Sequence, residues 1–268
     1  MRRRYTVLIA ATVAALVVGS LVIGSLFERP ATPGASAAIA VISTPTPTAP
    51  ARPTPSAYPV PVEVPTFDRT AHSIDDPTSI WVVINKTRPM SAASYVPTDL
   101  VDVPVAHTWS PLLRQGASNA LVSLFNAAGA EAGLALASNS AYRSYDSQVR
   151  VHNRDVASNG QAFADSNTAR PGFSEHQTGL AIDIGAASGR CSLNTCFADT
   201  AEGQWLAANA SRFGFLLRYP ADKVEMTGFA FEPWHYRYIG VDLAAEMYNM
   251  GVTTLEEFFG LSAAPDYD

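Results

Sequence analysis

Residues 173–185, FSEHQTGLAIDIG, place two potential metal ligands, His176 and Asp183, at fixed offsets around a short apolar run. The second half of the stretch alternates between large apolar and small or acidic residues, which predicts a β-strand with one face in the core. Asp183 then shares a face with Ala181, which is too small to block an approaching ion. Two ligands do not complete a catalytic zinc site, because such sites use three protein ligands and keep one position open. A third ligand must therefore come from elsewhere.

The chain has five histidines, and His235 has the most suggestive surroundings of the other four. His72, His107 and His152 lack a neighbourhood of carboxylates and aromatic residues, so we expect them to be surface or packing residues. In FEPWHYRYIG, Glu232 precedes His235 by three residues, and the intervening proline disfavours a helix, so the segment is predicted to enter a strand. Taken alone, an aromatic core strand explains this pattern as well as a functional site does.

Together, the two segments resemble the zinc D-alanyl-D-alanine carboxypeptidase family, which includes the VanY-type enzymes and the related LD-carboxypeptidases. The pattern of that family is Ser-x-His-x-x-Gly-x-Ala-x-Asp, followed by Glu-x-x-His. Every fixed position is present here, as Ser174, His176, Gly179, Ala181, Asp183, Glu232 and His235. The segments WVVINKTRPMSAASYVPTDLV, SAYRSYDSQ and GVTTLEEFFG also look like parts of that family, so the resemblance covers residues 78–260.

The resemblance implies a role for each matching residue. His176, Asp183 and His235 would bind one zinc ion (Zn2+) and leave a position for the water that attacks the peptide. Glu232 would be the general base, and Arg143 would stabilise the developing oxyanion or hold the carboxylate of the peptide. The remaining two candidates, Ser174 and Gln148, would position the substrate.

The implied function is a zinc-dependent D,D-carboxypeptidase that removes the C-terminal D-alanine from peptidoglycan stem peptides. Cleavage of an L,D bond and an endopeptidase that cuts within the cross-link are alternatives within the same chemistry. A wall-binding module with an inactive site is an alternative from another class, but such a module has no need of a base such as Glu232. The implied fold is α+β, of the Hedgehog and DD-peptidase type, with helices packed around a small antiparallel sheet.

Four flanking elements are expected to position these residues. Residues 111–133 have apolar positions near helical spacing and predict a helix, with Pro111 in its first turn and Gly133 at its end. The segment LALASNSAY predicts a strand that leads into Arg143, and SYDSQVRVHNRDVAS predicts a second helix. Residues 159–171 are expected to form a long loop.

The N-terminal part of the chain predicts a location outside the cytoplasm. Three arginines precede an uncharged run from Tyr5 to Phe27, whose 23 residues are enough to span a bilayer. Residues 1–27 are therefore predicted to be a single membrane anchor with a cytoplasmic N-terminus, although ASAA at 35–38 is an alternative as a cleavage site. Residues 28–66 hold 10 of the 19 prolines and predict an extended linker to one domain, residues 67–268, outside the cell.

Charge and cysteine content agree with this location. The formal net charge of the chain is -6, and residues 67–268 are more acidic still, which argues against a nucleic-acid partner. Outside the cytoplasm, Cys191 and Cys196 in a short polar loop predict a local disulfide. Zinc binding by these two cysteines is disfavoured, because no second pair or nearby histidine completes a set of ligands.

Overall fold

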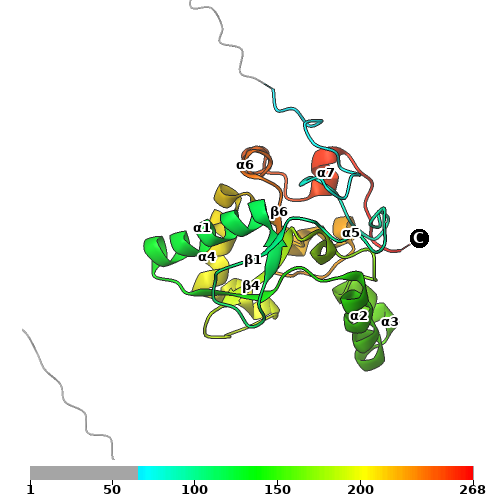
Figure 1. Ribbon diagram of the computed structural model, residues 1–268, viewed down its shortest axis with the longest axis horizontal. Coiled ribbons are helices and arrows are strands. Elements are labelled where there is room, and N and C mark those ends of the chain that lie inside the picture. The colour runs from blue at the N-terminus through cyan, green and yellow to red at the C-terminus, as the bar shows by residue number, and fades with distance from the viewer. Residues whose placement is uncertain (1–65, 268) are drawn as a thin grey trace, which may run out of the picture. The chain divides into compact units, whose positions relative to one another are not determined.

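The computed structural model describes residues 66–267 (Figure 1). The predicted anchor, residues 1–27, and all but the last residue of the predicted linker, residues 28–66, lie outside this range. Within the described residues, none of the helices combines the length and the apolar character that crossing a membrane requires. The anchor and the linker therefore stay predictions.

A four-stranded antiparallel sheet with the strand order β3-β4-β6-β5 lies at the centre of the fold. Its strands are β3 (Leu136–Ser140), β4 (Ala181–Ala186), β5 (Phe215–Leu217) and β6 (His235–Tyr238). A separate two-stranded sheet pairs β1 (Leu100–Asp102) with β2 (Leu112–Arg114). The strand predicted from the alternating pattern is β4. This strand pairs with β3 on one edge and with β6 on the other, and all six of its residues are buried, not one face only as expected.

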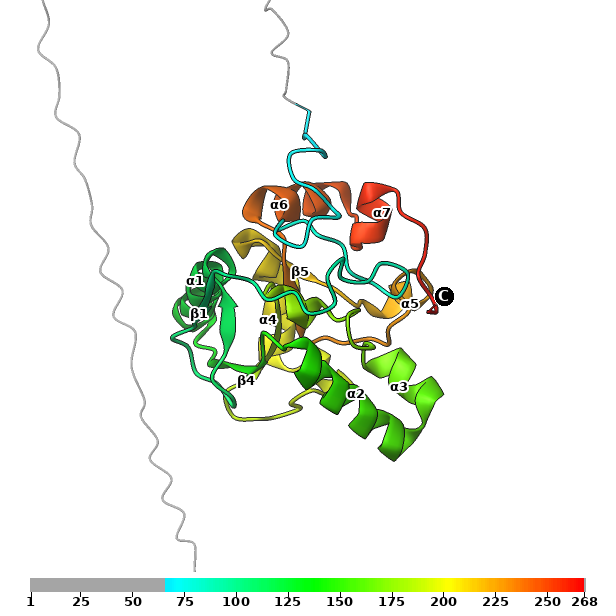
Figure 2. The same ribbon diagram turned by 45° about the vertical axis from the view of Figure 1, so that its right-hand side comes forward.

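Helices surround these sheets, so the predicted α+β class is confirmed. In the described part of the chain they are α1 (Gln115–Ala132), α2 (Tyr145–Asn159), α3 (Gln161–Asn167), α4 (Ala201–Asn209), α5 (Val224–Thr227), α6 (Val241–Met250) and α7 (Leu255–Phe259). In both views α2 and α3 lie side by side and project from the body of the fold, whereas α6 and α7 lie together at the opposite end (Figures 1 and 2).

The first helix begins later than predicted but ends where expected. Pro111 is not in its first turn, because the residues directly after it form β2 and pair with β1. Leu113 of β2 is 0% exposed, so core packing and strand pairing together outweigh the helical pattern there. At the other end, Gly133 adopts a left-handed conformation with φ 66°, which favours glycine and closes α1 as predicted.

The predicted loop at 159–171 was wrong, because it contains α3. Gly160, with φ 87°, ends α2 and lets the chain reverse into α3. Only Ala164 of α3 is buried, so the segment lacks the apolar periodicity from which a helix is predicted. The short helix ends directly before Thr168 and Ala169, which border the candidate site.

The core of the domain fixes the strands that carry the candidate site. Side chains of α1 and of strands β3, β4 and β6 pack into one apolar cluster, and residues of α6 and α7 pack with Trp81 and Val83 into a second one. In β4, Ile182 and Ile184 are both 0% exposed. Burial of such a side chain contributes about 1.5–3 kcal/mol, so β4 is a rigid base for Asp183.

Candidate active site

Three elements bring the predicted metal ligands together. His176 lies on a single 3₁₀ turn, η1 (Glu175–Thr178), which ends at Gly179 with φ 67°. A Cβ at Gly179 would lie 2.8 Å from Leu100 Cδ2, so only glycine fits both the backbone and the space. The chain then enters β4, and antiparallel pairing places Asp183 directly opposite His235, the first residue of β6.

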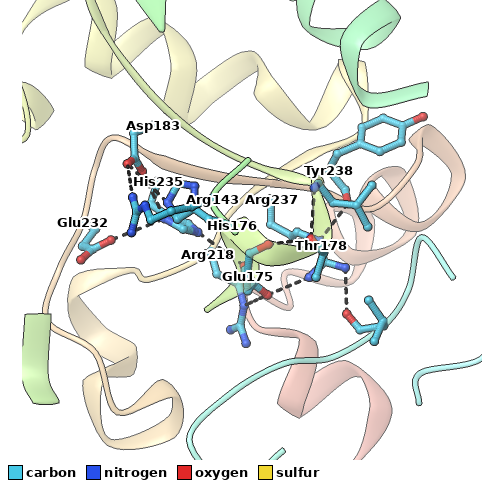
Figure 3. Close-up of polar contacts among 12 residues, drawn as sticks. Arg143, Glu175, His176, Thr178, Asp183, Arg218, Glu232, His235, Arg237 and Tyr238 are labelled. Atoms are coloured by element: carbon cyan, nitrogen blue, oxygen red, sulfur yellow. Dashed lines mark hydrogen bonds and ion pairs between the residues drawn. The ribbon is translucent and has the colours of Figure 1, made fainter. Parts of the chain in front are cut away.

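The three side chains form one buried cluster (Figure 3). Their potential ligand atoms all lie within 4.8 Å of one another. His176 Nε2 lies 3.4 Å from Asp183 Oδ2, and His235 Nδ1 lies 3.2 Å from Asp183 Oδ1. His176 is fixed in this orientation because its Nδ1 lies 2.7 Å from the carbonyl oxygen of Ala141, to which it can donate. His176 and Asp183 thus converge with His235, which lies 52 positions after Asp183, on one point where an ion would be held.

Two properties of the cluster fit a bound cation. Asp183 Oδ1 is buried and, among residues 66–267, accepts no well-formed hydrogen bond. Burial alone would lower the pKa of His235, but the carboxylates of Asp183, Glu175 and Glu232 raise it to about 9. The cluster thus holds a proton that a metal ion would displace. Two imidazoles and one carboxylate suit zinc and several other divalent metals.

Glu232 lies beside the cluster but is not one of the three grouped ligands. Its Oε2 is 3.6 Å from His235 Nδ1, and its side chain is 12% exposed. Burial raises the pKa of Glu232 to about 8; the positive charge of His235 opposes this shift, and the negative charge of Asp183 adds to it. A carboxyl group whose pKa lies near neutrality can take up and release a proton during a reaction.

Arg143 reaches the same site from the end of β3. Its Nη2 lies 4.0 Å from Asp183 Oδ2, and its Nη1 donates a hydrogen bond of 2.8 Å to Gln148 Oε1. Gln148, on α2, is 0% exposed and donates in turn to the carbonyl oxygen of Ala169 at 2.6 Å. Both ends of the Gln148 amide are thus engaged within the protein, and its oxygen holds Arg143. Burial lowers the pKa of Arg143, but a guanidinium stays charged at neutral pH.

The cluster opens into a pocket of about 210 Å³ that all the predicted metal-binding, catalytic and substrate-binding residues line, Ser174 and Gln148 included. Leu193 also lines this pocket, and it lies within the loop that the Cys191–Cys196 disulfide closes. The disulfide predicted between Cys191 and Cys196 is confirmed, and the loop that it closes borders the site. The substrate contacts of Ser174 and Gln148 stay predictions.

A buried charge network behind the cluster was not predicted from the sequence. Glu175 Oε1 accepts hydrogen bonds from Arg218 Nε and Arg237 Nη1, each at 2.9 Å. Arg218 also donates to both oxygens of Glu256, at 2.7 and 3.0 Å. The available signal was the presence of charged residues in apolar or aromatic surroundings, as in FGFLLRYP and HYRY. Buried charges are rare without a partner, so such residues are expected to find one another.

Comparison with known proteins gives the family. The VanY family profile, described as D-alanyl-D-alanine carboxypeptidase, matches residues 110–241, which contain all three candidate metal ligands. YodJ of Bacillus subtilis (strain 168) is 40% identical over 192 residues, which cover 70% of this chain and 69% of YodJ. The chain belongs to the VanY family. It is thus a member of a family of carboxypeptidases, as the two motifs predicted.

Solved structures agree with membership of the VanY family. The LdcB LD-carboxypeptidase superposes with a TM-score of 0.64 at 39% identity, over 69% of this chain and 88% of LdcB. A mutant of the vancomycin-resistance D,D-pentapeptidase VanY, in complex with Zn(II), superposes with a TM-score of 0.56 at 35% identity. That match covers 66% of this chain and 97% of the VanY chain. Both likenesses support the α+β fold.

Proposed function

We propose that this protein is a zinc-dependent D,D-carboxypeptidase that removes the C-terminal D-alanine from peptidoglycan stem peptides. The observation that carries the proposal is the buried cluster of His176, Asp183 and His235, with Glu232 and Arg143 in the same pocket. The activity that describes the VanY family and the Zn(II) complex of a VanY relative support the substrate and the metal.

The predicted site residues of the pocket each have a role in this reaction. When bound, a zinc ion would polarise the scissile carbonyl and lower the pKa of a water at its open position. Glu232 would take a proton from the attacking water and deliver it to the leaving amine of D-alanine. Arg143, held by Gln148, would bind the carboxylate of the peptide or the developing oxyanion, since its planar fork suits either. Ser174 would help to position the substrate.

Cleavage of an L,D bond is the second candidate. It is favoured by one observation, the likeness to the LdcB LD-carboxypeptidase, which has the higher TM-score and identity of the two solved structures described above. The metal cluster and Glu232 would serve both reactions, because the difference lies in the residue that precedes the leaving D-alanine. The recognition of that residue therefore decides between the two candidates.

We place this activity outside the cytoplasm, with a single-pass anchor in the cell membrane. The uncharged run from Tyr5 to Phe27, preceded by arginines, supports the anchor. The disulfide between Cys191 and Cys196 supports an oxidising compartment, because such bonds are rare in the cytosol.

Product analysis tests the proposed function. The full-length protein is incubated with muropeptides that end in D-Ala-D-Ala and, separately, with muropeptides that end in L-Lys-D-Ala or its diaminopimelate counterpart. Mass spectrometry then identifies the products. We expect the loss of one D-alanine from the first substrate. Cleavage of the second substrate alone would replace the D,D assignment with the L,D one, and cleavage of neither would remove the carboxypeptidase proposal.

A further inference from the structure

One ring nitrogen of His235 faces Asp183, another of the candidate metal ligands, and the other faces the buried carboxylate of Glu175 (Figure 3). Nδ1 lies 3.2 Å from Asp183 Oδ1, on the side of the cluster, whereas Nε2 lies 3.5 Å from Glu175 Oε2. Within residues 66–267, neither His235 Nε2 nor Glu175 Oε2 has a well-formed hydrogen bond to any other group. These two buried atoms therefore face each other without a competitor.

We propose that Glu175 is a positioning residue, whose carboxylate accepts the Nε2 proton of His235 and so keeps Nδ1 directed at the metal ion. A neutral imidazole carries its proton on one nitrogen only, and the hydrogen bond made at that nitrogen selects it. Carboxylates commonly have this role behind metal-binding histidines. The inference rests on the zinc site of the proposed function and adds to it the group that orients one ligand.

His176, the other histidine of the site, is oriented by a hydrogen-bond acceptor behind its ring, and Glu175 supplies the corresponding acceptor for His235. His176 Nδ1 lies 2.7 Å from the main-chain oxygen of Ala141, which leaves Nε2 for the cluster. No substitution removes a carbonyl oxygen of the main chain. His235 instead depends on a side chain, so the orientation of this one ligand can be altered by changing Glu175 alone.

Glu175 is fixed before any ion binds. Its Oε1 accepts from Arg218 and Arg237, each at 2.9 Å, and all three side chains are 0% exposed. Arg237 is held in turn by the main-chain oxygen of Val82, at 2.8 Å. Rotation of the carboxylate would leave two buried guanidinium groups without their partner, which is strongly unfavourable. Glu175 Oε2 is therefore already held in position facing His235 before an ion binds.

Glu256 allows this role to be separated from a purely structural one. It belongs to the same network, because both of its oxygens accept from Arg218 and Oε1 also accepts from Asn85 at 2.8 Å. It is as buried as Glu175, with 0% exposure. In the described part of the chain, however, it forms no hydrogen bond or ion pair with any of the three metal ligands. We therefore expect removal of its charge to disturb the network and to spare the three candidate metal ligands.

The experiment compares Glu175→Gln with the matched control Glu256→Gln in the full-length protein. Zinc affinity is measured by competition with a chromophoric chelator, the visible spectrum of the Co2+-loaded protein reports ligand geometry, and thermal unfolding of the metal-free protein reports stability. We expect Glu175→Gln to weaken zinc binding by about 10–100-fold and to change the cobalt spectrum. Glu256→Gln is expected to keep both near wild type even where its unfolding temperature falls.

A third variant covers the case in which Glu175→Gln does not fold. Glu175→Asp keeps the negative charge between the arginines but draws the carboxylate back from His235 by one methylene, so it too is expected to weaken zinc binding. Wild-type affinity in the folded Glu175 variants, or an equal loss in Glu256→Gln, would overturn the inference. A wild-type protein that binds zinc but cleaves neither muropeptide would remove the proposed function and leave this inference standing.

Discussion

Replacing Glu232 with glutamine separates catalysis from stability. Because burial raises the pKa of Glu232 to about 8 from an ordinary 4.5, the folded state of the metal-free protein resists ionisation of this group. A carboxyl group with a raised pKa destabilises the folded state once the pH exceeds the unfolded value, and the cost grows until the folded pKa is reached. At pH 7, about 2.5 pH units above the unfolded value, this cost is about 3 kcal/mol.

Glutamine has nearly the shape of glutamic acid and does not ionise. Metal-free Glu232→Gln is therefore expected to be more stable than the metal-free wild type by up to about 3 kcal/mol at pH 7, and by less than about 1 kcal/mol at pH 5. The same variant should lose turnover by about 10²–10⁴-fold, the usual contribution of a positioned base, and should retain its zinc. A single substitution would thus stabilise the metal-free protein and abolish most of the activity of the zinc-loaded one.

Urea unfolding of chelator-treated protein at both pH values, metal analysis and a D-alanine release assay measure these effects. Glu225→Gln is the matched control, because Glu225 is an exposed glutamate in the same part of the chain. Near-normal turnover in Glu232→Gln would refute the base assignment, and loss of zinc would make Glu232 a ligand. Lower stability than the wild type at pH 7 would refute the reasoning about its burial.

Two further predictions concern the disulfide and helix α3. Replacing both Cys191 and Cys196 with serine should lower the free energy of unfolding by about 2 kcal/mol, because the disulfide closes a short loop, and should leave zinc content unchanged. Loss of metal in that variant would favour cysteine ligation instead. Asp165→Asn should lower the thermal midpoint at pH 7 but not near pH 2. The hydrogen bonds from Arg170 lower the pKa of Asp165 to about 2 from 3.8, against the opposing effect of burial, so its stabilisation is present above pH 4 and disappears as the pH falls through the folded value. An equal loss of thermal stability at both pH values would contradict this assignment.

The three candidate metal ligands could be predicted from the sequence because they lie in two short motifs. Fixed offsets in the first motif place His176 and Asp183, and an expected strand carries His235 in the second. What the sequence could not supply was their register, since antiparallel pairing of Asp183 with His235 depends on how β4 and β6 align within the sheet. Only the family resemblance predicted that the two motifs meet in one site.

The supporting residues could not be predicted, because their contacts are not local. Arg218 meets Glu175 across 43 positions and Glu256 across 38, and no sequence periodicity records such pairs. Gln148 was expected to face the substrate, yet its contact with Arg143 depends on how α2 is placed after β3. Local patterns also failed for α3, where burial of Ala164 alone leaves no apolar stripe.

The dependence of peptide cleavage on zinc tests the central claim most directly. Zinc per chain and D-alanine release are measured on the full-length protein, before chelation, after chelation and after zinc is returned. Because His176, Asp183 and His235 are the proposed ligands, we expect activity to fall to background with the metal removed and to return at one zinc per chain. Undiminished cleavage by protein that metal analysis shows to be free of zinc and other divalent ions would contradict the account.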